Sequence, residues 1–360
     1  MIKHAYIHIP FCIRKCRYCS FISGFNIKRK NEYLNALFSE ITKKYNNEEL
    51  STIYFGGGTP SLLEIEDLNN ILSYFKFNDK TEITIEINPE TADLEKLINL
   101  RENGFNRISL GVQTFNNEIL KLIGRNHSEE IIYNSINNIK KAGFENFSID
   151  LIYGLPTQTI ENFKTDLNKA IQTECKNISS YGLKIEENSY FGKNTPTNLP
   201  NEDMQAEMFL LMCNILKENN FEHYEISNFA KKGFYSNHNC AYWKNKNYYG
   251  FGLNASGYEK NIRYKNISNF NEYIKNPLLL EEEEILTEKE TMENEIFLAL
   301  RLKSGVNIEE INKKYNINFE KKYSLIIEKY KDYLVIKNNH CKLTEKGILI
   351  SNNIMSEFID

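Results

Sequence analysis

Three of the seven cysteines in this 360-residue chain stand within eight residues of one another. Cys12, Cys16 and Cys19 have the spacing Cys-x3-Cys-x2-Cys. Three thiolates this close together can hold three corners of a [4Fe–4S] cluster. The fourth iron then lacks a protein ligand and is open to a substrate, as catalytic metal sites are. Zinc is the alternative, but three cysteines leave it one ligand short, and no fourth cysteine or close histidine follows.

Further residues suited to ligand binding stand at or near the ends of short β-branched runs. The glycines of Gly56–Thr59 allow backbone groups to approach a ligand closely. Glu86 ends an apolar strand pattern, where a carboxylate needs a partner. Gln113, Arg125 and Asp150 follow at similar places; the guanidinium suits a carboxylate and Asp150 suits ribose hydroxyls. Local hydrogen bonding explains each one alone, but four polar residues at one end of a fold favour a ligand site.

The elements that must position these residues alternate between strands and helices over the first half of the chain. Strands are predicted at Ala5–Ile9, Thr52–Phe55, Glu82–Ile87, Arg107–Val112, Phe147–Tyr153 and Ile178–Lys184. Helices are predicted at Asn31–Lys44, Ile65–Phe75, Thr91–Asn103, Ser128–Ala142 and Ile160–Thr173. Six such repeats indicate an α/β fold in which a parallel sheet curls into a partial (β/α)6 barrel. Ligands then bind at the carboxyl ends of the strands.

The pattern changes after Lys184. Asn201–Asn219 predicts one amphipathic helix with methionines in its core stripe, and Tyr224–Tyr258 is an aromatic-rich irregular segment. An acidic run precedes an α-rich tail with a small hairpin, which resembles a winged-helix domain. Residues 291–360 carry 11 Lys/Arg and 10 Asp/Glu, a net of +1, which favours a lid or docking domain over DNA binding. We expect a barrel domain over 1–230, a connecting segment over 231–285 and a C-terminal domain over 286–360.

The composition is that of a globular protein with few special partners. Hydrophobic residues make up 41% and charged residues 26%, and the net charge is −4, which gives no electrostatic basis for binding nucleic acid. No signal peptide pattern precedes Cys12, and no apolar run approaches the roughly 20 residues that span a bilayer. Scattered free cysteines and an oxygen-labile cluster indicate the cytoplasm.

The motifs, in their order, resemble the radical SAM superfamily and, within it, the oxygen-independent coproporphyrinogen III oxidase-like (HemN/HemW) family. They are YIHIPFC, GGGTP, ExNP, SLGVQTF, GRxH and DLIYGLP. The resemblance implies that Cys12, Cys16 and Cys19 hold a [4Fe–4S] cluster whose open iron chelates S-adenosylmethionine (SAM). An injected electron then cleaves SAM to a 5′-deoxyadenosyl radical. The SAM contacts implied are Tyr6, Gly57, Gly58, Thr59, Glu86, Gln113, Arg125 and Asp150.

Two features are closest to the HemW-type haem chaperones of this family. The oxidases have a fourth cysteine, in a CxxxCxxCxC pattern, where this chain has Phe21. His238-Asn-Cys-Ala-Tyr242-Trp243 matches the HNxxYW motif of the chaperones, which the resemblance associates with haem. An imidazole can ligate haem iron, and aromatic faces can cover a porphyrin. Taken alone, such a histidine is more often engaged in packing or hydrogen bonding.

The resemblance therefore implies a protein that binds haem and delivers it to respiratory haemoproteins. A flavodoxin or ferredoxin is the implied reductant, and the implied location is the cytoplasm at the periphery of the membrane. One alternative is the decarboxylating coproporphyrinogen III oxidase, against which the missing fourth cysteine counts. A second alternative is a HemN-like radical SAM methyltransferase that uses a second SAM.

Overall fold

The computed structural model describes residues 1–359. In its main sheet, successive side chains alternate between the two faces. Along each central strand one set of residues, such as Ile7, Ile53 and Ile85, is fully buried beneath the helices. The intervening residues, Tyr6 and Glu86 among them, point to the opposite, inner face. This period of two lets one sheet bury an apolar layer and line an interior at the same time.

The expected parallel sheet is present and its six central strands are neighbours in chain order. They are β1 (His4–Ile9), β2 (Thr52–Gly57), β3 (Glu82–Ile87), β4 (Arg107–Gln113), β5 (Phe147–Tyr153) and β6 (Asn177–Gly182). Three further strands extend it to nine: β7 (Glu222–Glu225), β8 (Asn228–Ala230) and β9 (Tyr249–Phe251). β9 runs parallel to β1, and β8 runs antiparallel to β6. The two edges, β7 and β9, do not pair, so the barrel is open on one side.

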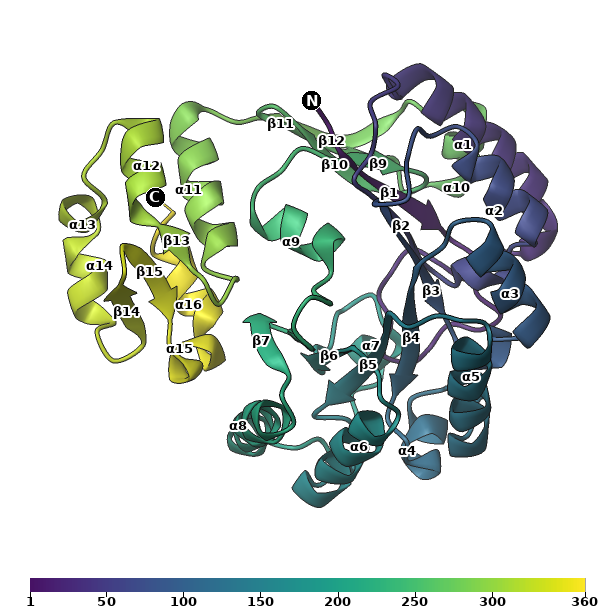
Figure 1. The fold of residues 1–360 in the computed structure, drawn as a ribbon, viewed down its shortest axis with the longest axis horizontal. Helices are drawn as coiled ribbons and strands as arrows, with labels where there is room; N and C mark the ends of the chain where they lie inside the picture. Colours follow the sequence, from purple (N-terminus) through teal and green to yellow (C-terminus); the bar gives the residue numbers. More distant parts are fainter. Residues whose placement is uncertain (360) are drawn as a thin grey trace.

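Helices cover the outer face of this sheet, while its concave face looks towards α9 (Figure 1). The covering helices and the two that follow β6 are α1 (Lys30–Lys44), α2 (Ile65–Leu72), α3 (Leu94–Glu102), α4 (Asn117–Leu122), α5 (Glu129–Lys141), α6 (Ile160–Gln172), α7 (Tyr190–Lys193) and α8 (Glu202–Glu218). Single turns of 3-10 helix lie at Ile27–Arg29, Pro60–Leu62 and Pro89–Thr91. Met208 and Met212 of α8 are fully buried, as expected for a core stripe.

The segment expected to be irregular contains regular elements. α9 (Asn237–Trp243) lies on the open side of the barrel (Figure 1). It is followed by β10 (Ser256–Glu259), β11 (Ile262–Asn266), α10 (Phe270–Lys275) and β12 (Leu280–Ile285). β10, β11 and β12 form a separate antiparallel sheet. The acidic run is its edge strand: Glu282 and Glu284 pair with Lys265 and Arg263 across the ladder, so cross-strand charges offset a low strand propensity.

The C-terminal part has the helices and the hairpin wing that the sequence predicts. Its elements are α11 (Glu288–Ala299), β13 (Val306–Asn307), α12 (Ile308–Tyr315), α13 (Phe319–Lys322), α14 (Ser324–Lys329), β14 (Leu334–Lys337), β15 (His340–Leu343), α15 (Glu345–Leu349) and α16 (Ser351–Ser356). β13, β15 and β14 form a small sheet. The divisions at 230 and 285 stay a prediction.

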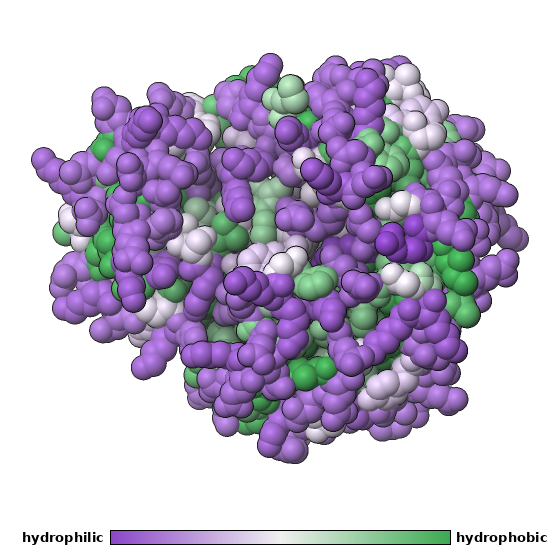
Figure 2. All heavy atoms as spheres, in the orientation of Figure 1, coloured by the Kyte–Doolittle hydropathy of each residue, from purple (hydrophilic) through white to green (hydrophobic). Residues whose placement is uncertain are grey.

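The face of the molecule drawn in Figure 2 is mainly hydrophilic. On the face drawn in Figure 2, hydrophobic residues lie in small groups among hydrophilic ones. Within residues 1–359 no helix is both long enough and apolar enough to span a bilayer.

Candidate functional site

The three cysteines lie on a loop whose two ends pair with each other. β1 ends at Ile9, and Phe11 then pairs with Phe25 in an isolated bridge, so the chain leaves and re-enters the fold at one point. The Gly24 N–H donates to the Pro10 carbonyl at 3.0 Å. Phe11 is fully buried and meets the Tyr33 ring edge-on, which anchors the paired ends of the loop in the core. The intervening arc presents Cys12, Cys16 and Cys19 to one cavity.

The chemistry of this loop fits a cluster better than a single ion. Its half-buried donors are three thiols, and burial raises the pKa of Cys19. Within residues 1–359 no three His, Cys, Asp or Glu side chains gather around one ion position. The cysteines of a cube ligate separate corners, so they stand farther apart than the ligands of one zinc ion. Arg125 Nη1 lies 3.7 Å from Cys16 Sγ and supplies the positive charge that thiolates favour.

The glycine turn after β2 is bound to this loop through backbone groups. The Gly58 N–H donates to the Ile9 carbonyl at 2.8 Å, and the Thr59 N–H donates to the Phe11 carbonyl at 2.7 Å. A Cβ on Gly58 would lie 2.6 Å from that second carbonyl oxygen, so only glycine allows this approach. The Thr59 hydroxyl lies 3.7 Å from Cys12 Sγ. Gly57, Gly58 and Thr59 therefore border the cluster loop, as expected.

Gly57→Ala is expected to distort this turn. Gly57 has φ of +112°, and a Cβ there would lie 2.5 Å from the His8 ring. Gly143 has φ of +81° with nothing within 4 Å, so Gly143→Ala is the matched control, with backbone strain of about 1–2 kcal/mol alone. We expect Gly57→Ala to lower the melting temperature more than the control and to weaken SAM binding, measured by equilibrium dialysis, about tenfold. Equal effects of the two variants would show that contact with His8 is unimportant.

His8 is a site residue that the sequence analysis missed. Its Nε2–H donates to the Ile22 carbonyl at 2.9 Å, which leaves Nδ1 to accept from the Tyr6 hydroxyl at 3.0 Å. Burial lowers the pKa of His8 to about 4, so the ring is neutral. His8 thereby ties the returning end of the cluster loop to β1. Its alternation with Tyr6 in YIHIPF was the available signal.

Glu86 lies on the inner face and joins two neighbouring elements. One carboxylate oxygen accepts from the Tyr54 hydroxyl at 2.9 Å and the other from the Gly57 N–H at 3.0 Å. Burial, together with the charge of Asp150, raises the pKa of Glu86 to about 7. A cationic group placed here, such as the ammonium of an amino acid, would stabilise the charged carboxylate. Glu86 is thus positioned for the contact expected of it.

The raised pKa of Glu86 predicts a pH dependence. Between the ordinary pKa of 4.5 and about 7, the folded chain keeps a proton that the unfolded chain has lost. Stability of the SAM-free protein must then fall as pH rises through this window, by up to about 3 kcal/mol from this group. We expect Glu86→Gln to remove that fall, as measured by urea unfolding at pH 5 and pH 7.5. The control is Glu118→Gln, because the Glu118 side chain is 80% exposed and its loss should leave the slope unchanged.

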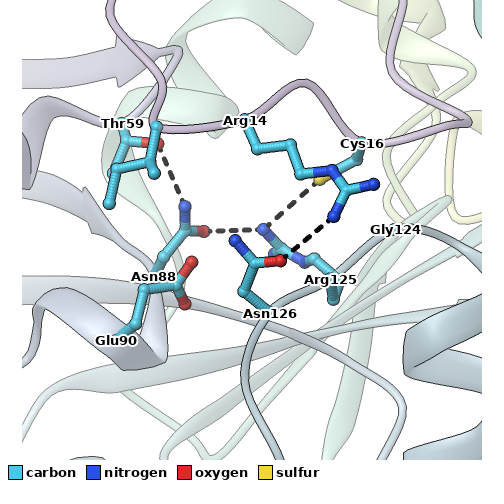
Figure 3. Close-up of a pocket in the computed structure, with 9 residues that line it drawn as sticks. Arg14, Cys16, Thr59, Asn88, Glu90, Gly124, Arg125 and Asn126 are labelled. Carbon is cyan, nitrogen blue, oxygen red and sulfur yellow. Dashed lines mark hydrogen bonds between the residues drawn. The ribbon is translucent and has the colours of Figure 1, made fainter.

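Arg125 joins three parts of the site (Figure 3). Its Nη1 donates to Asn88 Oδ1 at 2.9 Å and lies near Cys16, while its Nη2 donates to the Gly111 carbonyl at 2.7 Å. Asn88 Nδ2 in turn donates to the Thr59 hydroxyl at 3.0 Å. Within the chain the guanidinium thus meets neutral acceptors, and its Nε is buried without a partner. A ligand carboxylate at Arg125 stays a prediction. Asn88, in the ExNP motif, was not expected to take part.

Gln113 and Asp150 reach the same interior from β4 and β5. Gln113 has φ of +70° at a register shift, a β-bulge that turns its side chain into the cavity. Asp150 Oδ2 accepts from the Ser109 hydroxyl at 2.7 Å, and burial raises the pKa of its carboxyl. Ser148 and Ser179 are its other hydrogen-bond partners. Strand serines therefore occupy part of the capacity that was expected to serve ribose hydroxyls.

One cavity of about 480 Å³ contains nearly all of these groups. Cys12, Cys16, Cys19, Gly57, Gly58, Thr59, Glu86, Gln113, Arg125 and Asp150 line it together. Tyr6 stacks on Tyr54, a lining residue, at 6.1 Å between ring centroids. Its size is that of a small-molecule site, and thiols at one end with hydroxyls and carboxylates below suit a cluster and a polar cofactor.

The chain is similar to known proteins along nearly its whole length. Residues 6–170 match the radical SAM superfamily and residues 286–350 match the HemN C-terminal domain. The chain is 40% identical to Heme chaperone HemW of Lactococcus lactis over 99% of this chain and 97% of that protein. It is 35% identical to Heme chaperone HemW of Bacillus subtilis, over 99% of both.

The chain belongs to the HemW family. In fold it matches coproporphyrinogen III oxidase (HemN) from Escherichia coli, a radical SAM enzyme, with a TM-score of 0.87 at 24% identity over 99% of this chain and 90% of that chain. Radical SAM membership implies a [4Fe–4S] cluster and SAM. The cysteine loop would hold the cluster, and the lined cavity would hold SAM, which supplies a 5′-deoxyadenosyl radical upon reduction.

The HNxxYW segment forms α9, and its histidine is buried and fully bonded. His238 Nδ1 meets the Thr52 hydroxyl at 2.7 Å, and Nε2 meets the Tyr242 hydroxyl at 2.7 Å. Its ring stacks on Tyr54 at 5.0 Å. Burial holds the pKa of His238 well below its ordinary value, so the ring is neutral. In this conformation neither ring nitrogen is free to bind iron.

The tryptophan of the same segment faces the C-terminal domain. The Arg301 guanidinium lies over the Trp243 ring at 4.5 Å, in a cation–π contact. Asn294 Nδ2 donates to Asn245 Oδ1 at 3.0 Å just beyond the helix. At the other end, the N–H groups of Asn237 and His238 each donate to Glu82 at 3.0 Å. α9 thus connects the barrel with the C-terminal domain.

Proposed function

We propose that this HemW family member is a haem chaperone that holds a [4Fe–4S] cluster and SAM, binds haem and passes it to haem-accepting proteins. Similarity along the whole chain to two curated haem chaperones carries this proposal. The cluster loop and the SAM cavity are both present, which supports a working radical SAM centre. The recipients are respiratory haemoproteins, reached from the cytoplasm at the membrane periphery.

The chain's own residues prepare the centre in three ways. His8 and Arg125 hold the cysteine loop in place, the glycine turn brings backbone groups up to it, and Glu86 offers a carboxylate to a cation. Exposed Phe21 occupies the place where the oxidases have their fourth cysteine, which counts against decarboxylation. A flavodoxin or ferredoxin supplies the electron at the exposed cationic loop around Arg14 and Lys15.

We assign the haem contact to His238, Tyr242 and Trp243 of α9. Ligation by His238 requires Nε2 to give up its hydrogen bond to Tyr242. This competition distinguishes a ligand from a structural histidine. Tyr242→Phe removes the competing hydroxyl and is expected to strengthen haem binding, whereas His238→Ala is expected to weaken it roughly tenfold or more.

Haemin titration of the anaerobically reconstituted protein, followed in the Soret region, tests the proposal on wild type and both variants. Haem transfer to an apo-haemoprotein is measured on the same samples. Stoichiometric haem binding and transfer by the wild type support the chaperone. The samples also receive SAM, reductant and coproporphyrinogen III; decarboxylated product without specific haem binding would establish an oxidase instead. Haem binding indifferent to both variants would place haem away from α9.

A further inference from the structure

Arg107 is a buried cation without a hydrogen-bonding partner. It begins β4 and is 2% exposed, and its Nε lacks a hydrogen-bond partner. Within residues 1–359 no hydrogen bond or ion pair engages the rest of its guanidinium. Glu82 and Asp150 act on it through charge at longer range, and they raise its pKa. Leaving the Nε–H of a buried guanidinium without a partner is costly, so a partner from outside the chain is indicated.

The guanidinium is aimed at the cavity rather than into the core. Arg107 shares the inner face of β4 with Ser109, Gly111 and Gln113, and all four line the cavity. Because Gln113 lies at the carboxyl end of the strand, beside the cluster loop, Arg107 lies at the opposite, lower end. Six residues of a strand separate the two by roughly 20 Å. Any group that Arg107 binds is therefore distinct from the part of a ligand that meets the cluster.

A hydroxyl without a hydrogen-bond partner and a side chain of α9 lie near Arg107. Thr84, its register partner on β3, has a buried hydroxyl without a hydrogen-bond partner. Asn239 of the HNxxYW helix lines the same cavity, and the charge of Arg107 is felt by His238. A planar guanidinium in the same cavity as the Asn239 side chain is suited to a carboxylate, which it can bind through two parallel hydrogen bonds.

We propose that Arg107 forms a carboxylate-binding subsite at the lower end of the cavity. This rests on the proposed function, under which the carboxylate is a propionate arm of haem held near α9. The carboxylate of SAM has the same chemistry, but SAM meets the open iron at the opposite end of the cavity, and the experiment separates the two.

The test compares haemin with haemin dimethyl ester, whose propionates are blocked, on the full-length reconstituted protein. We expect wild type to bind the free acid about tenfold more tightly than the ester, and Arg107→Gln to abolish that preference by weakening only the free acid. SAM affinity, measured by equilibrium dialysis, should change less than twofold. Arg101→Gln removes an exposed arginine from the outer helix α3 and should change nothing.

Each contrary result is informative. Equal binding of acid and ester by wild type overturns the subsite and leaves haem carriage standing, whereas no binding of either form overturns both proposals. If Arg107→Gln still binds the free acid more tightly than the ester, only water meets the guanidinium. If Arg107→Gln weakens SAM binding alone, the guanidinium binds the SAM carboxylate. Either result overturns the propionate contact. If circular dichroism shows that Arg107→Gln does not fold, the same comparison of free acid and ester is made on wild type and Arg107→Lys. The lysine keeps the charge without the planar fork, so a reduced preference is expected and an undiminished one contradicts paired hydrogen bonding.

Discussion

Replacing Cys16 with alanine is expected to reduce the iron of anaerobically reconstituted protein to roughly a tenth of the wild-type content, because two thiolates cannot hold three corners of a cube. Binding of SAM should fall with it, since the open iron is lost. Iron and sulfide analysis, visible absorption and equilibrium dialysis with SAM measure the two effects.

Cys213→Ala is the control, because it removes a thiol that is buried in α8 and faces no part of the cluster loop. It is expected to keep full iron content with a modest loss of stability. Full iron in Cys16→Ala, or equal iron loss in both variants, would contradict the assignment of the cluster to the loop.

Replacing Arg125 with lysine is expected to weaken both the cluster and SAM binding by roughly 10- to 100-fold, although the charge is retained. A single ammonium cannot reach Asn88, the Gly111 carbonyl and Cys16 together, as the two guanidinium nitrogens do. Leaving these part-buried acceptors unpaired should also cost about 1–3 kcal/mol of stability. Cluster retention during dilution into chelator and urea unfolding are the measurements.

Arg17→Lys provides the comparison for Arg125→Lys. Arg17 lies in the cysteine loop and, like Arg125, donates to a backbone carbonyl, that of Leu122, at 3.1 Å, but this contact is exposed. Its replacement should cost less than about 1 kcal/mol. If the two lysine variants lose their clusters at the same rate, the buried contacts of Arg125 are not what holds the loop.

The barrel was predictable because its strands are built on one simple pattern. Each combines a β-branched run with a strict alternation, and the six predicted strands overlap the six observed ones. The strand pattern also predicted a ligand-facing position for Glu86 and Asp150, and both line the cavity. The motif spacing then gathered the cluster loop and the glycine turn at the carboxyl ends of the strands, where the structure has them.

The elements that the sequence did not predict depend on distant partners. β9 is three residues long and exists because β1 offers an unpaired edge to Tyr249–Phe251. β12 consists largely of glutamates, whose low strand propensity is overcome by pairing with β11. α9 was read as irregular because its seven residues carry no amphipathic period.

The missed site residues had a usable signal. Once Gln113 is assigned to the inner face, parity assigns Ser109 and Arg107 to it as well, and Tyr6 likewise brings His8. Alternation along a strand predicts the face on which a residue lies, but it does not predict the residue's hydrogen-bond partner. That Arg125 would meet Asn88 and the Gly111 carbonyl depends on a fold in which segments 37 and 14 residues away converge.

Helix α9 limits which C-terminal domains could replace the present one in a chimeric protein. Its first turn is fastened inside the barrel through Glu82, and its last residue supports Arg301 of the C-terminal domain. A chimera whose C-terminal domain lacks equivalents of Arg301 and Asn294 would leave Trp243 without its cation and Asn245 without its donor. Exchange of the C-terminal domain therefore requires a replacement that keeps these two contacts with α9 and the residues just after it.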